Sequence, residues 1–301
     1  MAEDNRQAAS ASSGPPAYRD HIYRSTDDRL DLYARLYDGD GPPLLLMHGL
    51  TRNSGDFEVL ADHLAGKYKL IVPDQRGRGR SDYDPDPENY TPAVYVEDMY
   101  ALIDGLDLGT IGMVGTSMGG LMAMMMAART PDRFNSLILN DIGPAVEASG
   151  LARIQSYVGQ PAVFDDWQQA ADHCQAVQSD NMIGFAAQDW MAFARNTCEE
   201  TPKGNIRFAY DPAISIGLSG SEQTVVPPDL WPMWDRLSAL PVLVIRGALS
   251  DILSRTTVAE MGRRHPDQFT AVEIDDRGHT PMLDEADALA AIDRFYAQIG
   301  Q

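Results

Sequence analysis

The pattern Gly-Thr-Ser-Met-Gly-Gly at residues 115–120 constrains the fold of this chain more than any other stretch. It follows a short apolar run, residues 111–114, and precedes a helix-forming one, residues 121–129. A strand that passes directly into a helix needs a very tight turn, and the residue at its apex is forced toward positive φ. The flanking glycines leave room where a Cβ would collide with that turn. The spacing therefore predicts that Ser117 projects from a strand–turn–helix junction.

A serine at the start of a helix lies where backbone N–H groups and the helix dipole favour negative charge. A serine nucleophile and its oxyanion require this setting, and G-x-S-x-G is the pattern of a nucleophile elbow. The motif alone is weak evidence, because it also arises by chance in turns without any catalytic role. The assignment of Ser117 depends on whether the chain supplies a base, an acid and a second oxyanion donor.

Composition narrows the classes of partner. The chain has 301 residues, enough for a large core, and a formal net charge of −20 from 44 acidic and 24 basic side chains. Such a charge disfavours nucleic acid and anionic membranes, although solubility alone accounts for it. No apolar stretch approaches the roughly 20 residues of a spanning helix, and the N-terminus does not resemble a signal peptide. We therefore expect a cytoplasmic protein with no nucleic-acid or membrane partner.

The two cysteines, Cys174 and Cys198, do not occur in a metal-ligand spacing. A zinc site is therefore not expected, and two free thiols are the expected state in a cytoplasmic protein.

The chain reads as alternating strands and helices after a polar tail, residues 1–17, that we expect to be disordered. Alternating apolar patterns at 20–24 and 30–37 predict an antiparallel pair. Buried strands are then expected at 44–47, 69–72, 111–114 and 134–140, with helices at 55–65, 92–106 and 121–129 between them. Ser54 is a candidate cap for the first helix, and Thr91-Pro92 begins the second. This order predicts a mostly parallel, doubly wound sheet.

The alternation stops over residues 144–237. This segment has helical patterns at 150–158, 165–178 and 189–198 and no strong strand signal. It is predicted to be a helical insertion, or cap, at the carboxyl edge of the sheet, where ligands bind in open α/β folds. Strands and helices resume at 242–246, 257–264, 269–274 and 285–299. The core domain is thus predicted to comprise residues 18–143 and 238–301.

Among six histidines, His279 is the predicted general base. It follows a glycine in a polar loop directly after the last predicted strand, at the sheet edge that carries the elbow. The remaining histidines fall in an edge strand, on helix surfaces and in the insertion, and His48 is better explained as structural.

The carboxylate that orients His279 has two candidates. Asp251 lies just beyond the strand at 242–246 and gives the chain order Ser117, Asp251, His279. Asp141 directly follows the strand after the elbow and is the alternative. We predict Asp251, because it combines the expected chain order with a loop that follows a strand.

The oxyanion of a tetrahedral intermediate needs two hydrogen-bond donors. The backbone N–H of Met118, next to the nucleophile, is one predicted donor. The loop after the strand at 44–47 supplies the second, and Gly49 permits the sharp turn that leaves the Leu50 N–H as this donor.

Together these motifs resemble the α/β-hydrolase fold family over about residues 20–300. The resemblance rests on His48-Gly49, the DQRGRGRS loop at 74–81, the elbow, Asp251 and Gly278-His279. It implies a central sheet of eight strands with a cap domain at 144–237. The glycines of the 74–81 loop are interpreted as structural, since no phosphate-loop pattern continues from them.

The family includes esterases, lactonases, carbon–carbon bond hydrolases, epoxide hydrolases and dehalogenases, so the fold does not define the reaction. Serine at the elbow disfavours the last two classes, whose members have aspartate there. Thr280 stands where the carbon–carbon hydrolases typically have tryptophan. We therefore expect hydrolysis of a small carboxylic ester through an acyl-enzyme, with no cofactor or metal. A carbon–carbon bond or lactone hydrolase with the same triad, and a ligand receptor of the same fold, remain alternatives.

The insertion is rich in aromatic and methionine side chains that would suit an apolar pocket. Trp190 and Met191, with Thr280 from the core, are the candidate substrate contacts. The alternative for each cap residue is packing between the cap helices. The sequence does not indicate the oligomeric state.

Overall fold

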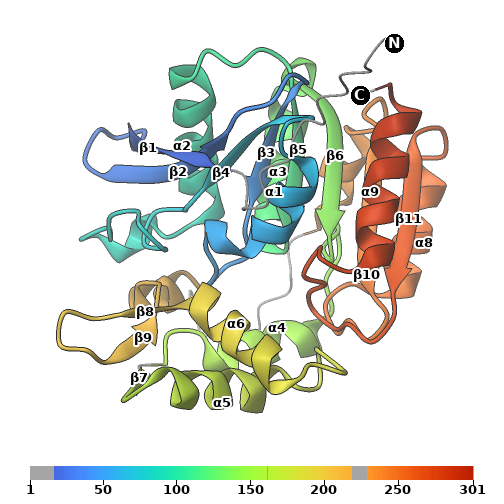
Figure 1. Ribbon diagram of the computed structural model, residues 1–301. Helices are drawn as coiled ribbons and strands as arrows, with labels where there is room; N and C mark the ends of the chain where they lie inside the picture. The colour runs from blue at the N-terminus through green and yellow to red at the C-terminus, as the bar shows by residue number, and fades with distance from the viewer. Residues whose placement is uncertain (1–16, 161, 219–228, 301) are drawn as a thin grey trace, which may run out of the picture.

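An eight-stranded sheet forms the centre of the computed structural model, which describes residues 17–160, 162–218 and 229–300 (Figure 1). The predicted disordered tail therefore lies outside the described residues, except for Ala17. The strand order is β1-β2-β4-β3-β5-β6-β10-β11. The bounds are Tyr18–Arg24 (β1), Asp31–Tyr37 (β2), Pro43–Met47 (β3), Lys69–Pro73 (β4), Ile111–Thr116 (β5), Phe134–Asn140 (β6), Val242–Gly247 (β10) and Phe269–Ile274 (β11).

The sheet is mostly parallel, as predicted. Strands β1 and β2 form an antiparallel pair, and β2 is antiparallel to β4, whereas the pairs from β4 to β11 are parallel. In the register, Thr116 lies opposite Asn140, and Asn140 lies opposite Ile245. The carboxyl ends of β5, β6 and β10 are therefore neighbours at one edge of the sheet.

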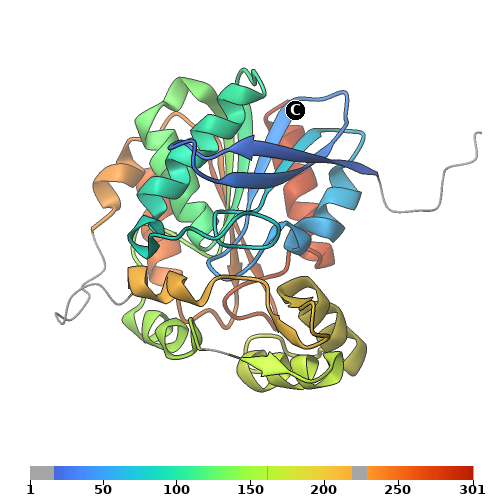
Figure 2. The same ribbon diagram turned by 90° about the vertical axis from the view of Figure 1, so that its left-hand side faces the viewer.

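Helices cover both faces of the sheet (Figure 2). The packing of the apolar clusters places α1 (Glu58–Leu64) and α9 (Ala286–Gln298) on one face. The other face carries α2 (Pro92–Gly105), α3 (Met118–Arg129) and α8 (Arg255–Arg264). Short 3-10 helices occur at Ser54–Phe57 (η1), Pro87–Asn89 (η2) and Pro131–Arg133 (η3).

Two predicted helix starts can be compared with the structure. Thr91 caps α2 by accepting a hydrogen bond from the Val94 N–H, at 3.4 Å, as the Thr-Pro pair predicts. The start of the first helix was predicted wrongly, because Asn53 rather than Ser54 is the cap. The Asn53 side chain accepts from the Gly55 N–H at 2.9 Å, and η1 precedes α1.

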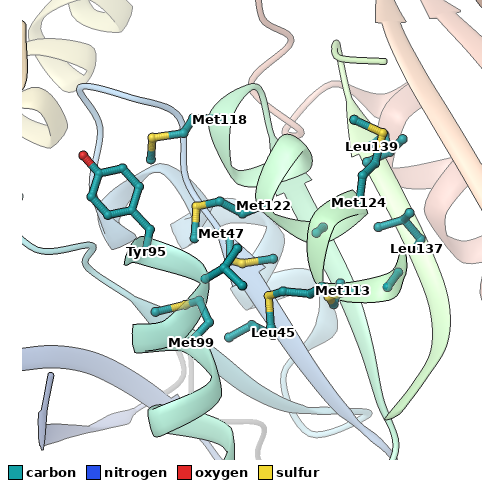
Figure 3. Packing of buried hydrophobic residues seen from close by; sticks show 14 of the residues in the cluster. Leu45, Met47, Tyr95, Met99, Met113, Met118, Met122, Met124, Leu137 and Leu139 are labelled. Atoms are coloured by element: carbon teal, nitrogen blue, oxygen red, sulfur yellow. The ribbon is translucent and has the colours of Figure 1, made fainter. Parts of the chain in front are cut away.

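Methionine side chains fill much of the core between the sheet and α2 and α3 (Figure 3). Met47 and Met113 come from the strands, Met99 from α2, and Met122 and Met124 from α3, and all five are fully buried. Unbranched, polarisable side chains suit the irregular gaps under a helix that begins in a sharp turn. Within the described ranges, no helix is long and apolar enough to cross a membrane.

The segment between β6 and β10 lies across the end of the sheet toward which the β6 arrow points (Figure 1). It has its own apolar cluster. Its elements are α4 (Ala148–Tyr157), β7 (Val163–Phe164), α5 (Trp167–Gln178), α6 (Ala187–Thr197), β8 (Cys198–Glu200), β9 (Ile206–Phe208), η4 (Pro212–Leu218) and α7 (Trp231–Asp235). The antiparallel sheet β7-β9-β8 was not predicted, because strands of two or three residues are too short to show a period. We refer to residues 144–237 as the cap.

Candidate active site

Ser117 lies at the turn between β5 and α3 with φ 52° and ψ −114°. This strained backbone is held on both sides, because its N–H donates to Asn140 O at 3.0 Å and its carbonyl accepts from the Leu121 N–H at 3.0 Å. Glycine is required at both flanking positions by close backbone approach. A Cβ at Gly115 would lie 2.5 Å from the Gly119 backbone, and a Cβ at Gly119 would lie 2.0 Å from Met47 O. The turn therefore has the geometry of a nucleophile elbow.

His279 lies in the loop after β11 and faces Ser117, with 2.8 Å between its Nε2 and the serine Oγ. Two contacts fix this loop. The Gly278 N–H donates to Asn181 O of the cap at 2.7 Å, and the Asn140 amide donates to Pro281 O at 2.8 Å. Because Asn140 also donates to Thr116 Oγ1 at 3.1 Å, one side chain ties the elbow strand to the histidine loop.

Asp141 is the carboxylate that contacts His279, with 2.7 Å between its Oδ2 and the histidine Nδ1. It is fully buried, and it directly follows β6, the strand next to the elbow strand. The carboxylate also accepts from the Gly247 N–H at 3.0 Å and from Ser250 Oγ at 2.6 Å. Three partners, His279 among them, thus hold this carboxylate in place.

Asp251 does not occupy the position predicted for it. Both of its carboxylate oxygens accept from Arg153 of α4, at 2.6 and 2.8 Å, and these bonds lower the pKa of Asp251. The geometry therefore contradicts the expectation that Asp251 orients His279 and favours Asp141, the alternative. Chain order does not distinguish the two, because Asp141 also lies between Ser117 and His279 in sequence.

The predicted oxyanion donors lie in two segments next to Ser117. Leu50 belongs to the loop after β3, and Met118 begins α3. Met118 is the first residue of α3, where backbone N–H groups lack acceptors within the helix. Leu50 lines the cavity beside Ser117, and its carbonyl accepts from Arg78 Nε at 2.8 Å. This bond turns the carbonyl toward a buried guanidinium and fixes the orientation of the loop. The role of Arg78 was not anticipated from the sequence.

His48 supports the same loop as a neutral side chain. Its Nε2 accepts from the Gln75 N–H at 3.0 Å, so its Nδ1 carries the proton and donates to Gly49 O at 2.7 Å. Complete burial lowers the pKa of His48 from 6.5 to about 3. The structural interpretation of His48 agrees with these contacts.

A cavity of about 120 Å³ opens onto Ser117 and His279 between the core and the cap. Its core lining includes Gly49, Leu50, Arg52, Thr116 and Thr280, and its cap lining includes Tyr157, Cys174, Gln178, Met182 and Phe193. Of the three predicted substrate contacts, only Thr280 lies in this lining. Trp190 is buried against Phe185 and Phe193, and Met191 packs on the same cap cluster. The alternative interpretation, helix packing, fits both residues.

In the part of the chain that the structure describes, no group of three or more histidine, cysteine or acidic side chains is arranged to hold a metal ion. The Ser117 hydroxyl, the His279 imidazole and the buried Asp141 carboxylate form one hydrogen-bonded chain, and its first two members line the cavity.

Comparison with known proteins defines the family. A family model described as alpha/beta hydrolase fold matches residues 42–286, so the chain belongs to that family. The 3-hydroxybutyrate-oligomer hydrolase of Cupriavidus necator is 32% identical over 84% of this chain and 87% of its own length. The 2-(acetamidomethylene)succinate hydrolase of Mesorhizobium japonicum is 29% identical over 76% of this chain and 78% of its length. A solved alpha/beta hydrolase from Novosphingobium aromaticivorans has 39% identity and a TM-score of 0.89, covering 95% of this chain and 100% of that one.

Proposed function

We propose that this protein hydrolyses carboxylic esters through an acyl-enzyme formed on Ser117, with His279 as the base and Asp141 as its orienting acid. The observation that carries the proposal is the continuous hydrogen-bonded chain from Ser117 Oγ through His279 to Asp141, which faces a cavity under the cap. Membership of a hydrolase family and likeness to an oligomer hydrolase support the same reaction class.

The contacts of Asp141 define the tautomer of His279. An ionised carboxylate only accepts hydrogen bonds, so Nδ1 carries the proton and Nε2 presents a lone pair to the serine hydroxyl at 2.8 Å. His279 then accepts the serine proton as Oγ attacks the ester carbonyl, and Asp141 stabilises the imidazolium that forms. His279 later returns the proton to the leaving alcohol, and water hydrolyses the acyl-enzyme by the same steps.

The oxyanion donors complete this proposal. The N–H groups of Leu50 and Met118 would bind the carbonyl oxygen as it becomes charged, and loss of one such donor costs roughly 10²–10³-fold in kcat in a related setting. Arg78 acts through Leu50 and not on the substrate, since its guanidinium contacts the Leu50 carbonyl. It is therefore a positioning residue.

The substrate class follows from the cavity and the relative. A cavity of about 120 Å³ beside Ser117 accommodates a short acyl or alcohol group. The Cupriavidus relative, whose name specifies oligomers of 3-hydroxybutyrate, supports a short aliphatic ester as the substrate. We accordingly propose short esters of hydroxy acids as the first compounds to test.

The deciding experiment is hydrolysis of a chromogenic short-chain ester by wild-type protein and Ser117→Ala. We expect Ser117→Ala to lose turnover while its circular dichroism spectrum is unchanged. Ser156→Ala changes an exposed serine of α4 and serves as the matched control, with turnover retained. Undiminished turnover by Ser117→Ala would refute the assignment, and failure of an organophosphonate to label Ser117 would instead favour a ligand receptor.

A second candidate is hydrolysis of a substrate that is not a simple ester, favoured by the Mesorhizobium relative and its succinate-derived substrate. Carbon–carbon bond and lactone cleavage would use the same three residues. A panel of short esters, lactones, vinylogous diketones and 2-(acetamidomethylene)succinate separates these reactions by relative kcat/KM.

A cytoplasmic location stays a prediction from the sequence.

A further inference from the structure

The two cysteines of the chain meet in the cap. Cys174 belongs to α5 and Cys198 begins β8, and both are buried. Their side chains hydrogen bond with each other, and both sulfurs lie in the apolar cluster that holds the cap together. Both cysteines are reduced in the structure.

The pair is reached from the active-site cavity. Cys174 lines the cavity onto which Ser117 opens, whereas Cys198 lies behind it and is absent from the described lining. Thr197, the neighbour of Cys198 in sequence, does line the cavity. A small molecule that enters the cavity therefore meets the Cys174 sulfur first.

The electrostatic surroundings make the two thiols unequal. The hydrogen bond from Cys198 lowers the pKa of the Cys174 thiol, and the positive charge of Arg52 on the cavity wall acts in the same direction. The same hydrogen bond and burial raise the pKa of the Cys198 thiol. Asp56 holds Arg52 in place through Nε at 2.8 Å, and its guanidinium carbon lies 4.0 Å from the centre of the Phe193 ring. A thiolate is the reactive form of cysteine, and Cys174 is the thiol of the pair that lines the cavity, so we expect it to react first.

We propose that Cys174 and Cys198 form a hydroperoxide-oxidisable dithiol site in the roof of the active-site cavity, with Cys174 attacking first and Cys198 resolving. This site goes beyond the proposed ester hydrolysis and does not depend on it. The ligand class is a small hydroperoxide, of which hydrogen peroxide is the simplest.

The oxidation takes place in two steps, one at each sulfur. The Cys174 thiolate attacks one peroxide oxygen, so that an S–O bond forms, the O–O bond breaks and water leaves after protonation, giving a sulfenic acid. The Cys198 sulfur then attacks the Cys174 sulfur, so that the S–S bond forms, the S–O bond breaks and a second water leaves. Two thiols lose two electrons in total, and hydrogen peroxide is reduced to water.

The position of Cys198 determines the product. A sulfenic acid condenses with a neighbouring thiol to a disulfide, whereas without such a thiol further oxidation leads to a sulfinic acid. The two side chains hydrogen bond with each other, so the Cys198 sulfur is placed to react with an oxidised Cys174. The bond would join α5 to the junction of α6 and β8, two segments that carry cavity-lining residues.

The test is peptide mapping by mass spectrometry after treatment of the full chain with hydrogen peroxide. We expect a Cys174–Cys198 disulfide in the wild type. Cys198→Ser should accumulate a sulfenic acid at Cys174 that dimedone traps, and Cys174→Ser should react at Cys198 at least about tenfold more slowly. Ser117→Ala should form the disulfide at the wild-type rate, which separates this proposal from the hydrolytic one.

Two results would overturn the proposal. One is a folded wild type that forms no disulfide while a solvent-exposed model thiol is oxidised in the same solution. The other is equal labelling rates of the two single-serine variants. Thermal melts show whether each variant folds, and alanine replaces serine where serine destabilises the apolar cluster. The wild-type mapping decides the disulfide even if neither variant folds.

Discussion

Replacing Asp141 by asparagine tests the proposed triad most directly. The carboxylate has three donors around it, from Gly247, Ser250 and His279. An asparagine can place its single oxygen toward the Gly247 N–H only by turning its NH₂ group toward the histidine. His279 Nδ1 must then accept, so Nε2 carries the proton and can no longer take the one from Ser117.

The expected loss can be worked out from this geometry. A carboxylate and an imidazolium whose charge centres lie about 4 Å apart interact by roughly 4 kcal/mol at an effective dielectric constant near 20. That interaction alone corresponds to about 10³-fold in rate. The wrong tautomer adds to the loss, and the same change in a serine protease triad lowers kcat about 10⁴-fold. We therefore expect Asp141→Asn to reduce kcat by about 10³–10⁴-fold.

Asp251→Asn is the matched control, because it makes the same chemical change at the other candidate. Its partner is Arg153. The Asp251 side chain is 31% exposed and the Arg153 side chain is 27% exposed. Such a pair contributes about 1 kcal/mol or less to stability, and its loss leaves the contacts of His279 intact. We expect kcat within about threefold of the wild type. The measurement is steady-state hydrolysis of a short-chain chromogenic ester, with thermal melts for each variant. A large loss in Asp251→Asn with near-normal Asp141→Asn would refute the reasoning and return the acid role to Asp251.

Two further outcomes follow from the residues that support the site. Burial lowers the pKa of His48 from 6.5 to about 3, so between these pH values the unfolded chain binds a proton that the folded chain does not. The free energy of unfolding should fall as the pH decreases from 6.5, by up to about 1.4 kcal/mol per pH unit from this group. In urea titrations His48→Gln should show a shallower pH dependence than the wild type, and identical slopes would contradict the assignment. Asn140→Ala removes the bonds to Thr116 and Pro281, and we expect about tenfold lower kcat with little change in KM, whereas Asn135→Ala at the other end of β6 should have no effect. A normal kcat in Asn140→Ala would show that this tie does not position His279.

Local signals were sufficient to predict most of the core. The bounds of β6 and β11 match the predicted strands residue for residue, because turn residues stand on either side of both. The capped start of α2 was predicted for a similar reason, since one threonine and one proline specify it. The three cap strands were not predicted, because each has only two or three residues, and β7 pairs with β9 from about 40 residues away in sequence.

The orienting carboxylate could not be chosen from the sequence. Asp141 and Asp251 both follow a strand and both precede His279, so neither motif order nor loop position separates them. The difference appears only in three dimensions, where β6 lies between β5 and β10. Asp141 is then adjacent to the elbow, and it accepts from the Gly247 N–H at the end of β10 and from the Ser250 hydroxyl in the loop that follows.

The sequence also did not show which face of each cap helix lines the cavity. Trp190 and Phe193 are both buried on α6, and Phe193 lines the cavity while Trp190 does not. A helical pattern shows which residues are apolar but not which of two apolar neighbours each one packs against. The prediction of Trp190 as a substrate contact therefore failed, because only the placement of α6 against the core shows which of its apolar residues face the cavity.

The two carboxylates divide two tasks between them. All three members of the proposed triad come from the core, at the ends of β5, β6 and β11. Asp251 instead joins the core to α4 through Arg153, next to a close approach where a Cβ on Gly150 would lie 2.4 Å from Asp251 O. The loop after β10 therefore contacts both parts, since Ser250 Oγ donates to Asp141 at 2.6 Å while the next residue, Asp251, accepts from Arg153 of the cap at 2.6 Å. The cap also holds the histidine loop, because the Gly278 N–H donates to Asn181 O at 2.7 Å. We therefore expect cap residues away from Asn181 and Arg153 to be the positions where changes alter which substrate enters without moving His279.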